Sequence, residues 1–260
     1  PLIGIHHIEG HIAATSGSDL RFPALALVVS GGHTQLMLMR NEFDYKIIGQ
    51  TQDDAVGEAF DKVAKTLDLG YPGGPIVSQK ADEFEDKLKN VKNEKLKKEL
   101  EEISFPRPMA DKPNFDFSFS GLKTSVLYFF RQLQEQELDD KELDLYKSAI
   151  CNAFQEAAVD VLAKKTLKAI KEHSPKTVIL AGGVAANKNL RQELQKRISK
   201  LDPEINFLVP TLDLCGDNAA MIGLAAARKY RKLKELGKLD ELNENWKDLE
   251  ADSSLKLISL

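Results

Sequence analysis

Short apolar strands alternate with helices along this chain, and this alternation constrains the fold more than any other feature. Two apolar runs over residues 23–39 flank a Ser-Gly-Gly turn, which predicts a hairpin. Strands are also predicted over 115–119, 177–181 and 205–209. Helices are predicted over 53–67, 78–102, 143–172, 187–199 and 219–233. The pattern predicts the α/β fold class.

Composition narrows the class of protein further. The 260 residues are 42% hydrophobic and 29% charged, which is typical of a soluble domain or pair of lobes. The two cysteines, Cys151 and Cys215, cannot build a disulfide framework, so we expect a cytoplasmic protein. No apolar run approaches the roughly 20 residues of a membrane span. A net charge of -4 argues against unaided nucleic-acid binding. Modest candidates for contacts with RNA phosphates are Lys62, Lys65 and Lys123, although solvated surface lysines are the more common outcome.

Three histidines stand within the string HHIEGH near the start of the chain. On a helix, His7 and His11 share a face because they are four residues apart, so both rings can reach one metal ion. The zinc-peptidase pattern H-E-x-x-H is not matched, because Glu9 lies about 200° around the helix from His7. Surface or capping histidines are the alternative interpretation.

A third metal ligand is needed, and Asp217 is the candidate carboxylate. It stands in a Gly-Asp-Asn turn directly before a predicted helix. The alternative is that Asp217 is only the N-cap of that helix. Two histidines and one aspartate are compatible with iron, zinc, manganese or magnesium.

Two glycine turns are candidate nucleotide contacts. Backbone amides in the string VVSGGH (28–33) can approach a phosphate closely, and AGGVAAN (181–187) suits a nucleotide packed against exposed backbone. Ordinary hairpin and helix packing is the alternative for each turn. Asp61, near the second Gly-Gly pair of YPGGP, can bind ribose hydroxyls or remain a solvated helical residue.

The strings HHIEGH, VSGGHTQL, GEAFDKVAKTLDLGYPGGP, FPRP, DFSFSGLKT, AGGVAAN and CGDNAAMIG, in this order over residues 6–223, closely resemble the TsaD family of tRNA adenosine threonylcarbamoyltransferases. The resemblance implies the two-lobed ASKHA fold of actin and sugar kinases. It also implies metal-assisted transfer of a threonylcarbamoyl group from threonylcarbamoyl-AMP. The acceptor is the exocyclic amine of the adenosine next to the anticodon, in tRNAs reading codons that start with A.

Carried over by resemblance, the metal ligands are His7, His11 and Asp217. The nucleotide contacts are Val28, Val29, Ser30, Gly31, Gly32, Asp61, Gly74 and Asn187, and no residue receives a catalytic step. The resemblance implies one divalent metal ion, with iron or zinc favoured over magnesium or manganese, and an ATP- or AMP-type nucleotide. The implied partners are tRNA and proteins of the TsaB and TsaE types, with no membrane.

The chain also departs from the family pattern. Family members have a longer segment before the histidine string, so we expect the N-terminal lobe to be incomplete. Residues 1–27 are then its remnant, completed by 218–260, and 28–217 form the C-terminal lobe with a charged helical insertion near 80–103. Ser78 stands where many members have aspartate, which leaves one ribose contact open. A zinc metallopeptidase and a non-catalytic ATP-binding scaffold are the alternative functions.

Overall fold

A five-stranded mixed sheet forms the centre of the molecule in a computed structural model that describes residues 2–15, 19–242, 249–252, 255 and 257. The strands are β1 (Ala24–Val29), β2 (Thr34–Met39), β3 (Tyr45–Gln50), β4 (Thr177–Ala181) and β5 (Asn206–Leu208). Their spatial order is β3–β2–β1–β4–β5, with the first three antiparallel and β1, β4 and β5 parallel. The predicted hairpin of β1 and β2 is confirmed.

Strand β1 divides the interior into two cores, because successive side chains of a strand point to opposite faces. Leu25, Leu27 and Val29 face the larger core, whereas Ala24 and Ala26 face the smaller one. All of β1 is fully buried. The small alanine side chains give the smaller core little depth, so the helix on that face can lie close to the sheet.

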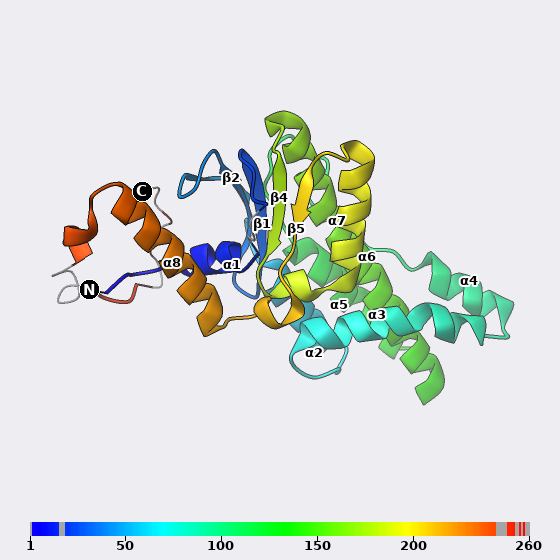
Figure 1. Cartoon of the computed structure of the whole chain (residues 1–260). Coiled ribbons are helices and arrows are strands. Elements are labelled where there is room, and N and C mark those ends of the chain that lie inside the picture. Colours follow the sequence, from blue (N-terminus) through cyan, green and yellow to red (C-terminus); the bar gives the residue numbers. More distant parts are fainter. Residues whose placement is uncertain (1, 16–18, 243–248, 253–254, 256, 258–260) are drawn as a thin grey trace.

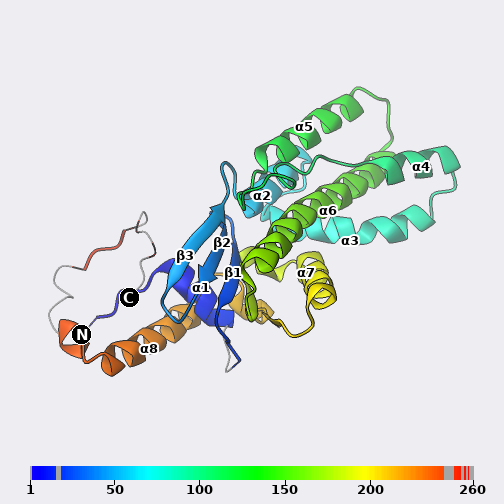
Figure 2. The same cartoon turned by 90° about the horizontal axis from the view of Figure 1, so that it is seen from above.

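Helices cover both faces of the sheet (Figures 1 and 2). They are α1 (His7–Thr15), α2 (Val56–Thr66), α3 (Gly73–Lys89), α4 (Glu94–Glu102), α5 (Ser120–Gln134), α6 (Asp140–His173), α7 (Lys188–Leu201) and α8 (Ala219–Glu235). Short 3₁₀ turns follow β4 (Gly183–Ala186), precede α8 (Leu212–Leu214) and follow it (Leu239–Leu242). Helix α1 lies on the alanine face of β1 with α8 packed against it, and α2 to α7 belong to the other side. The α/β prediction is confirmed.

Some predicted elements were wrong or missing. Residues 115–119 form no strand, because only Phe117 makes an isolated bridge, to Thr51. The helix predicted over 78–102 is two helices, and the Asn93 side chain caps the second by accepting from two backbone amides. Strand β3 was not predicted, since it lies at the edge of the sheet with only one fully buried residue. Helix α5 was also missed, although it buries an apolar series at helical spacing.

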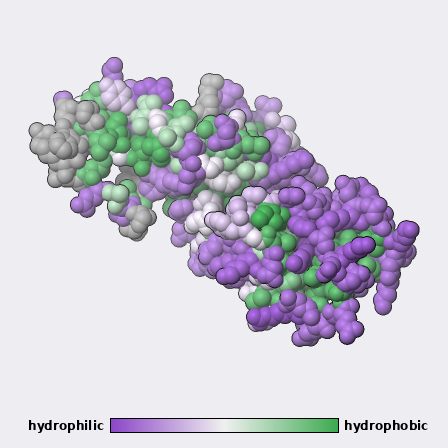
Figure 3. Space-filling model, turned by 90° about the horizontal axis from the view of Figure 1, so that it is seen from below, coloured by the Kyte–Doolittle hydropathy of each residue, from purple (hydrophilic) through white to green (hydrophobic). Residues whose placement is uncertain are grey.

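The two ends of the molecule differ in surface character. Seen from below, hydrophobic side chains gather at the end that carries α8, whereas hydrophilic ones cover most of the opposite, helical end (Figure 3). Leu224 and Tyr230 on α8 are exposed, as is Leu236 directly after it. Among the described residues, no helix combines the length and apolar character that crossing a membrane requires.

Candidate functional site

The first candidate site is a cluster of His7, His11 and Asp217, brought together from distant parts of the sequence. Oδ1 of Asp217 lies 3.3 Å from Nε2 of His7 and 3.2 Å from Nε2 of His11. The two imidazole rings meet edge to face with centroids 4.7 Å apart. One ligand atom from each of the three residues lies within 4.8 Å of the others. The three groups therefore face a common point, as metal ligands do.

Local sequence fixes the two histidines on α1. The carboxylate of Glu9 accepts a hydrogen bond from the backbone amide of His6 at 3.1 Å and is buried, so it caps the helix start and does not lie between the rings. Gly10 allows a close approach of α8, because a Cβ atom there would lie 3.0 Å from Cδ1 of Ile222 and 3.2 Å from Cγ of Met221. The tight contact between α1 and α8 brings the aspartate to the histidines.

The residue after Asp217 performs the capping function that the sequence left open. The side chain of Asn218 accepts from the backbone amide of Met221 at 2.8 Å, so Asn218 is the N-cap of α8. The carboxylate of Asp217 therefore does not cap α8. Its side chain is 75% exposed and turns toward the two imidazoles.

Burial makes His11 a suitable neutral donor. It lowers the pKa of His11, and the neighbouring His7 lowers that pKa further, while Asp217 only partly offsets the shift. Nδ1 and Nε2 of His11 are buried, and neither makes a hydrogen bond of good geometry with a described residue, although Nε2 is 3.2 Å from Asp217. A buried imidazole without a hydrogen-bond partner fits a metal ligand, because metals bind the neutral ring.

The glycine turn between β1 and β2 connects this cluster to a cavity. The backbone amides at the turn are held by Ser30: its Oγ accepts from the amide of His33 at 3.0 Å, and its own amide donates to the His33 carbonyl at 2.8 Å. The ring of His33 lies 6.4 Å from that of His7. Burial, followed by the charge of His7, lowers the pKa of His33. Gly31, two residues earlier in the same turn, lines the cavity.

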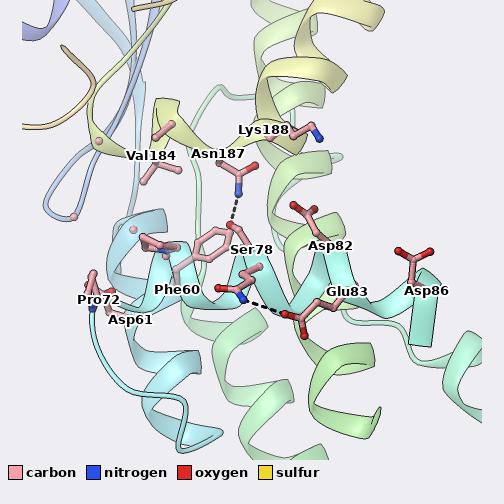
Figure 4. A pocket seen from close by; sticks show the side chains of 17 residues that line it. Phe60, Asp61, Pro72, Ser78, Asp82, Glu83, Asp86, Val184, Asn187 and Lys188 are labelled. Atoms are coloured by element: carbon pink, nitrogen blue, oxygen red, sulfur yellow. Dashed lines mark hydrogen bonds between the residues drawn. The ribbon is translucent and has the colours of Figure 1, made fainter. Parts of the chain in front are cut away.

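The cavity has a volume of about 680 Å³ and lies between the glycine turns and α3 (Figure 4). Backbone at Gly31, Gly57 and Gly183 forms one part of its wall. Gly57 must be glycine, because a Cβ atom there would lie 2.6 Å from the carbonyl oxygen of Ser30. Helix α2 therefore begins in direct contact with the turn.

The structure brings four of the eight predicted nucleotide contacts to this cavity: Gly31, Asp61, Gly74 and Asn187. Of the others, Val28 and Val29 are fully buried in β1, and Ser30 and Gly32 are outside the lining. Oδ1 of Asp61 accepts from the amide of Gly73 at 2.7 Å, so this carboxylate also holds the loop that enters α3.

Sequence reasoning missed Gly57, which lines the cavity, and Gln155, whose Oε1 accepts from Nδ2 of Asn187 at 2.7 Å. Gly57 stands in the GEAFDK string, so a signal was present. Gln155 is only 2% exposed, and a polar residue on the apolar side of a long helix was the available signal.

Two lysines that were candidates for RNA contacts, Lys62 and Lys123, form ion pairs within the chain. Asp54 accepts from Lys62 at 2.6 Å and from Lys123 at 2.7 Å, and Glu58 lies 2.8 Å from Lys62, so two carboxylates offset the two ammonium charges.

The strand order of the sheet, with an antiparallel three-stranded meander joined through helices to two parallel strands, places the molecule in the ASKHA class of α/β proteins. The cavity at its glycine turns and the metal-type cluster beside them agree with that class. Comparison with known proteins identifies the family. The TsaD family model, described as tRNA N6-adenosine threonylcarbamoyltransferase, matches residues 1–224, and the chain belongs to this family.

Curated relatives agree with the family match. The chain is 46% identical over 231 residues to the tRNA N6-adenosine threonylcarbamoyltransferase of Listeria welshimeri. This matched region is 88% of this chain and 61% of that protein. It is 46% identical over 233 residues to the protein of that name from Halalkalibacterium halodurans (89% and 62%). With the Lactobacillus johnsonii protein it shares 44% identity over 260 residues (99% and 66%). The chain thus spans between 61% and 66% of the length of these relatives.

Proposed function

We propose that this chain transfers a threonylcarbamoyl group from threonylcarbamoyl-AMP to the exocyclic amine of the adenosine next to the anticodon, in tRNAs reading codons that start with A. The observation that carries the proposal is the convergence of His7, His11 and Asp217 beside the turn that lines the cavity. Family membership and the names of the relatives support the same activity. The nucleophile in this reaction belongs to the RNA.

Three side chains would hold one divalent metal ion, for which iron or zinc is favoured over magnesium or manganese. A bound ion of this kind supplies Lewis-acid polarisation of phosphate or acyl oxygens. His11 contributes a neutral ring held by burial, and His7 contributes a half-exposed ring on the same helix face. Asp217 would contribute a carboxylate from the residue directly before the N-cap of α8, so α1 and the turn that enters α8 set the positions of the three donors.

The cavity would hold the nucleotide part of the substrate in one orientation. Backbone amides at the glycine turns favour phosphate, and these turns lie on the side of His33 and His7. The α3 side carries Asp82, whose negative charge repels phosphate, and Glu83, whose charge is partly offset by Lys87 at 3.1 Å. The phosphate end would therefore face the turns and metal cluster, and the nucleoside end would face α3. Val28, Val29, Ser30 and Gly32 would contribute through the position of the turn.

The division into lobes and the partner proteins are part of the same proposal. Residues 1–27 with 218–260 would form part of an N-terminal lobe, and 28–217 the C-terminal lobe with the charged insertion near 80–103. The packing of α1 on α8 supports this division, although part of 218–260 is outside the described residues. The net charge of -4 supports a need for help in binding tRNA, for which TsaB- and TsaE-type proteins in the cytoplasm are the proposed partners.

The test measures metal and product together. The purified chain, with its partner proteins, threonylcarbamoyl-AMP and tRNA, is assayed by mass spectrometry of digested tRNA, and bound metal is measured by elemental analysis. We expect His7→Ala and His11→Ala to lose metal and nearly all transfer, and His173→Ala, a histidine at the end of α6, to retain both. Full transfer by the His7→Ala/His11→Ala double variant, or none by the unaltered chain, would contradict the proposal. Casein cleavage lost in the same variants would instead support a metallopeptidase.

A further inference from the structure

A partly buried series of hydrogen bonds, called the relay below, reaches the cavity from α6. Nδ2 of Asn187 donates to Oε1 of Gln155 at 2.7 Å and to Oγ of Ser78 at 2.8 Å. Oδ1 of Asn187 accepts from the backbone amide of Leu190 at 2.8 Å, which makes Asn187 the N-cap of α7. Gln155 is 2% exposed and does not line the cavity, whereas Ser78 and Asn187 do. The relay therefore joins a buried side chain to two cavity residues.

Donor and acceptor roles in the relay are determined by its geometry. The backbone amide of Leu190 can only donate, so the carboxamide oxygen of Asn187 faces it and the NH₂ group faces the other two partners. Both hydrogens of that NH₂ group are then used, by Gln155 and Ser78. Ser78 acts as acceptor in its bond, so its own hydroxyl hydrogen is not consumed by Asn187. Among the bonds of described residues, Ser78 donates none.

Ser78 thus presents a neutral hydroxyl, able to donate, at the cavity wall. Figure 4 shows Asn187 above Ser78, with Asp82 one helical turn further along α3. Lys188 is the only cation among the described lining residues, against four carboxylates. This end of the cavity favours uncharged hydroxyl groups of a ligand over its phosphates.

We propose that Gln155 is a positioning residue, which orients Asn187 so that the hydroxyl of Ser78 contacts a sugar hydroxyl of the bound nucleotide. The inference rests on the proposed function, in which the cavity binds an AMP-type ligand. Gln155 itself touches no ligand. Its removal leaves one hydrogen of Asn187 without its acceptor, and the carboxamide then turns away from the geometry that directs the Ser78 hydroxyl into the cavity.

The experiment compares binding of AMP, 2′-deoxy-AMP and 3′-deoxy-AMP by titration calorimetry. One neutral hydrogen bond predicts that the full chain prefers AMP by about three- to tenfold over the analogue that lacks the contacted hydroxyl. Ser78→Ala and the near-isosteric Gln155→Met should each reduce this ratio to near one, and Gln155→Glu, which retains an acceptor, should preserve it. Gln155→Met should change nothing further when Ser78 is already alanine.

Each contrary result has a definite meaning. If Gln155→Met weakens AMP and deoxy-AMP equally, its role is structural and the relay is refuted. If Ser78→Ala keeps the preference, the contact is refuted even where Gln155→Met does not fold, because Ser78 is a small, half-buried residue whose truncation leaves the core intact. Either result leaves AMP binding, and hence the proposed function, in place. If the unaltered chain binds none of the three nucleotides, both proposals fail.

Discussion

The contact between Gly57 and the glycine turn leads to a sharp prediction for Gly57→Ala. The added Cβ would lie 2.6 Å from the Ser30 carbonyl oxygen and 2.9 Å from Cα of Gly31, and ordinary contact starts at 3.4 Å. Backbone must move, since no flexible side chain is at the contact. Such overpacking costs about 1–3 kcal/mol, and the gain from replacing a helical glycine, about 0.5–1 kcal/mol, offsets only part of it. The two ranges give a net loss of about 0–2.5 kcal/mol in the free energy of unfolding, with a central value of about 1 kcal/mol.

The same movement should reach the cavity, because Gly31 lines it and the amide of Gly57 donates to the Ser30 carbonyl at 3.3 Å. Urea unfolding followed by circular dichroism measures the stability. Titration with AMP measures whether the displaced turn changes the affinity of the cavity for the nucleotide. Gly223→Ala is the matched control: it is also a helical glycine, but its Cβ would meet nothing within 4 Å. It should stabilise the protein by up to about 1 kcal/mol. If both variants are equally stable, the steric reasoning is refuted.

Three further substitutions test other parts of the fold. Burial alone would raise the pKa of the Asp160 carboxyl group, but hydrogen bonds from Arg197 and Lys164 lower it below the ordinary value of 3.8. The ionised carboxylate therefore stabilises the folded protein fully above that value, and this contribution is lost as the pH falls through the lower pKa of the folded state. Asp160→Asn should cost about 1–3 kcal/mol at neutral pH, and urea titrations should show this difference shrinking below about pH 4. Asp53→Ala should cost about 1–2 kcal/mol, because the carboxylate accepts from two serine hydroxyls and two amides at the start of α5; unchanged unfolding would contradict that role. Lys165→Met should expose the loop over 112–114 to protease, because the buried ammonium donates to two of its carbonyls; an unaltered cleavage rate would count against it.

The helical spacing of the two histidines was enough to predict their shared orientation. Their convergence with Asp217 also followed, although from the resemblance of strings more than from spacing. The burial of His11 did not follow, since it depends on how closely α8 packs against Gly10, a tertiary contact that local sequence does not encode. Similarly, Asn218 took the capping position because its side chain suits it as well as that of Asp217 does.

Pairing partners far apart in sequence account for most of the other differences. The charges of Lys62 and Lys123 were visible, but the sequence did not show that both would bind Asp54. The aromatic alternation over 115–119 suggested a strand, yet Phe117 and Phe119 pack into the helical core while the backbone passes directly into α5. Strand periodicity alone cannot distinguish an extended segment with no neighbour from one in a sheet.

The residues of the proposed metal cluster come from α1 and from the turn before α8, whereas the cavity is lined by residues from 31 to 188. During synthesis, every cavity residue leaves the ribosome before Asp217 does. An ion that binds only the assembled cluster draws its affinity from the docking of α8 on α1, and in return each tenfold increase in its free concentration above the dissociation constant strengthens that docking by about 1.4 kcal/mol. A fall in the cellular supply of the ion would then weaken the docking of α8 on α1.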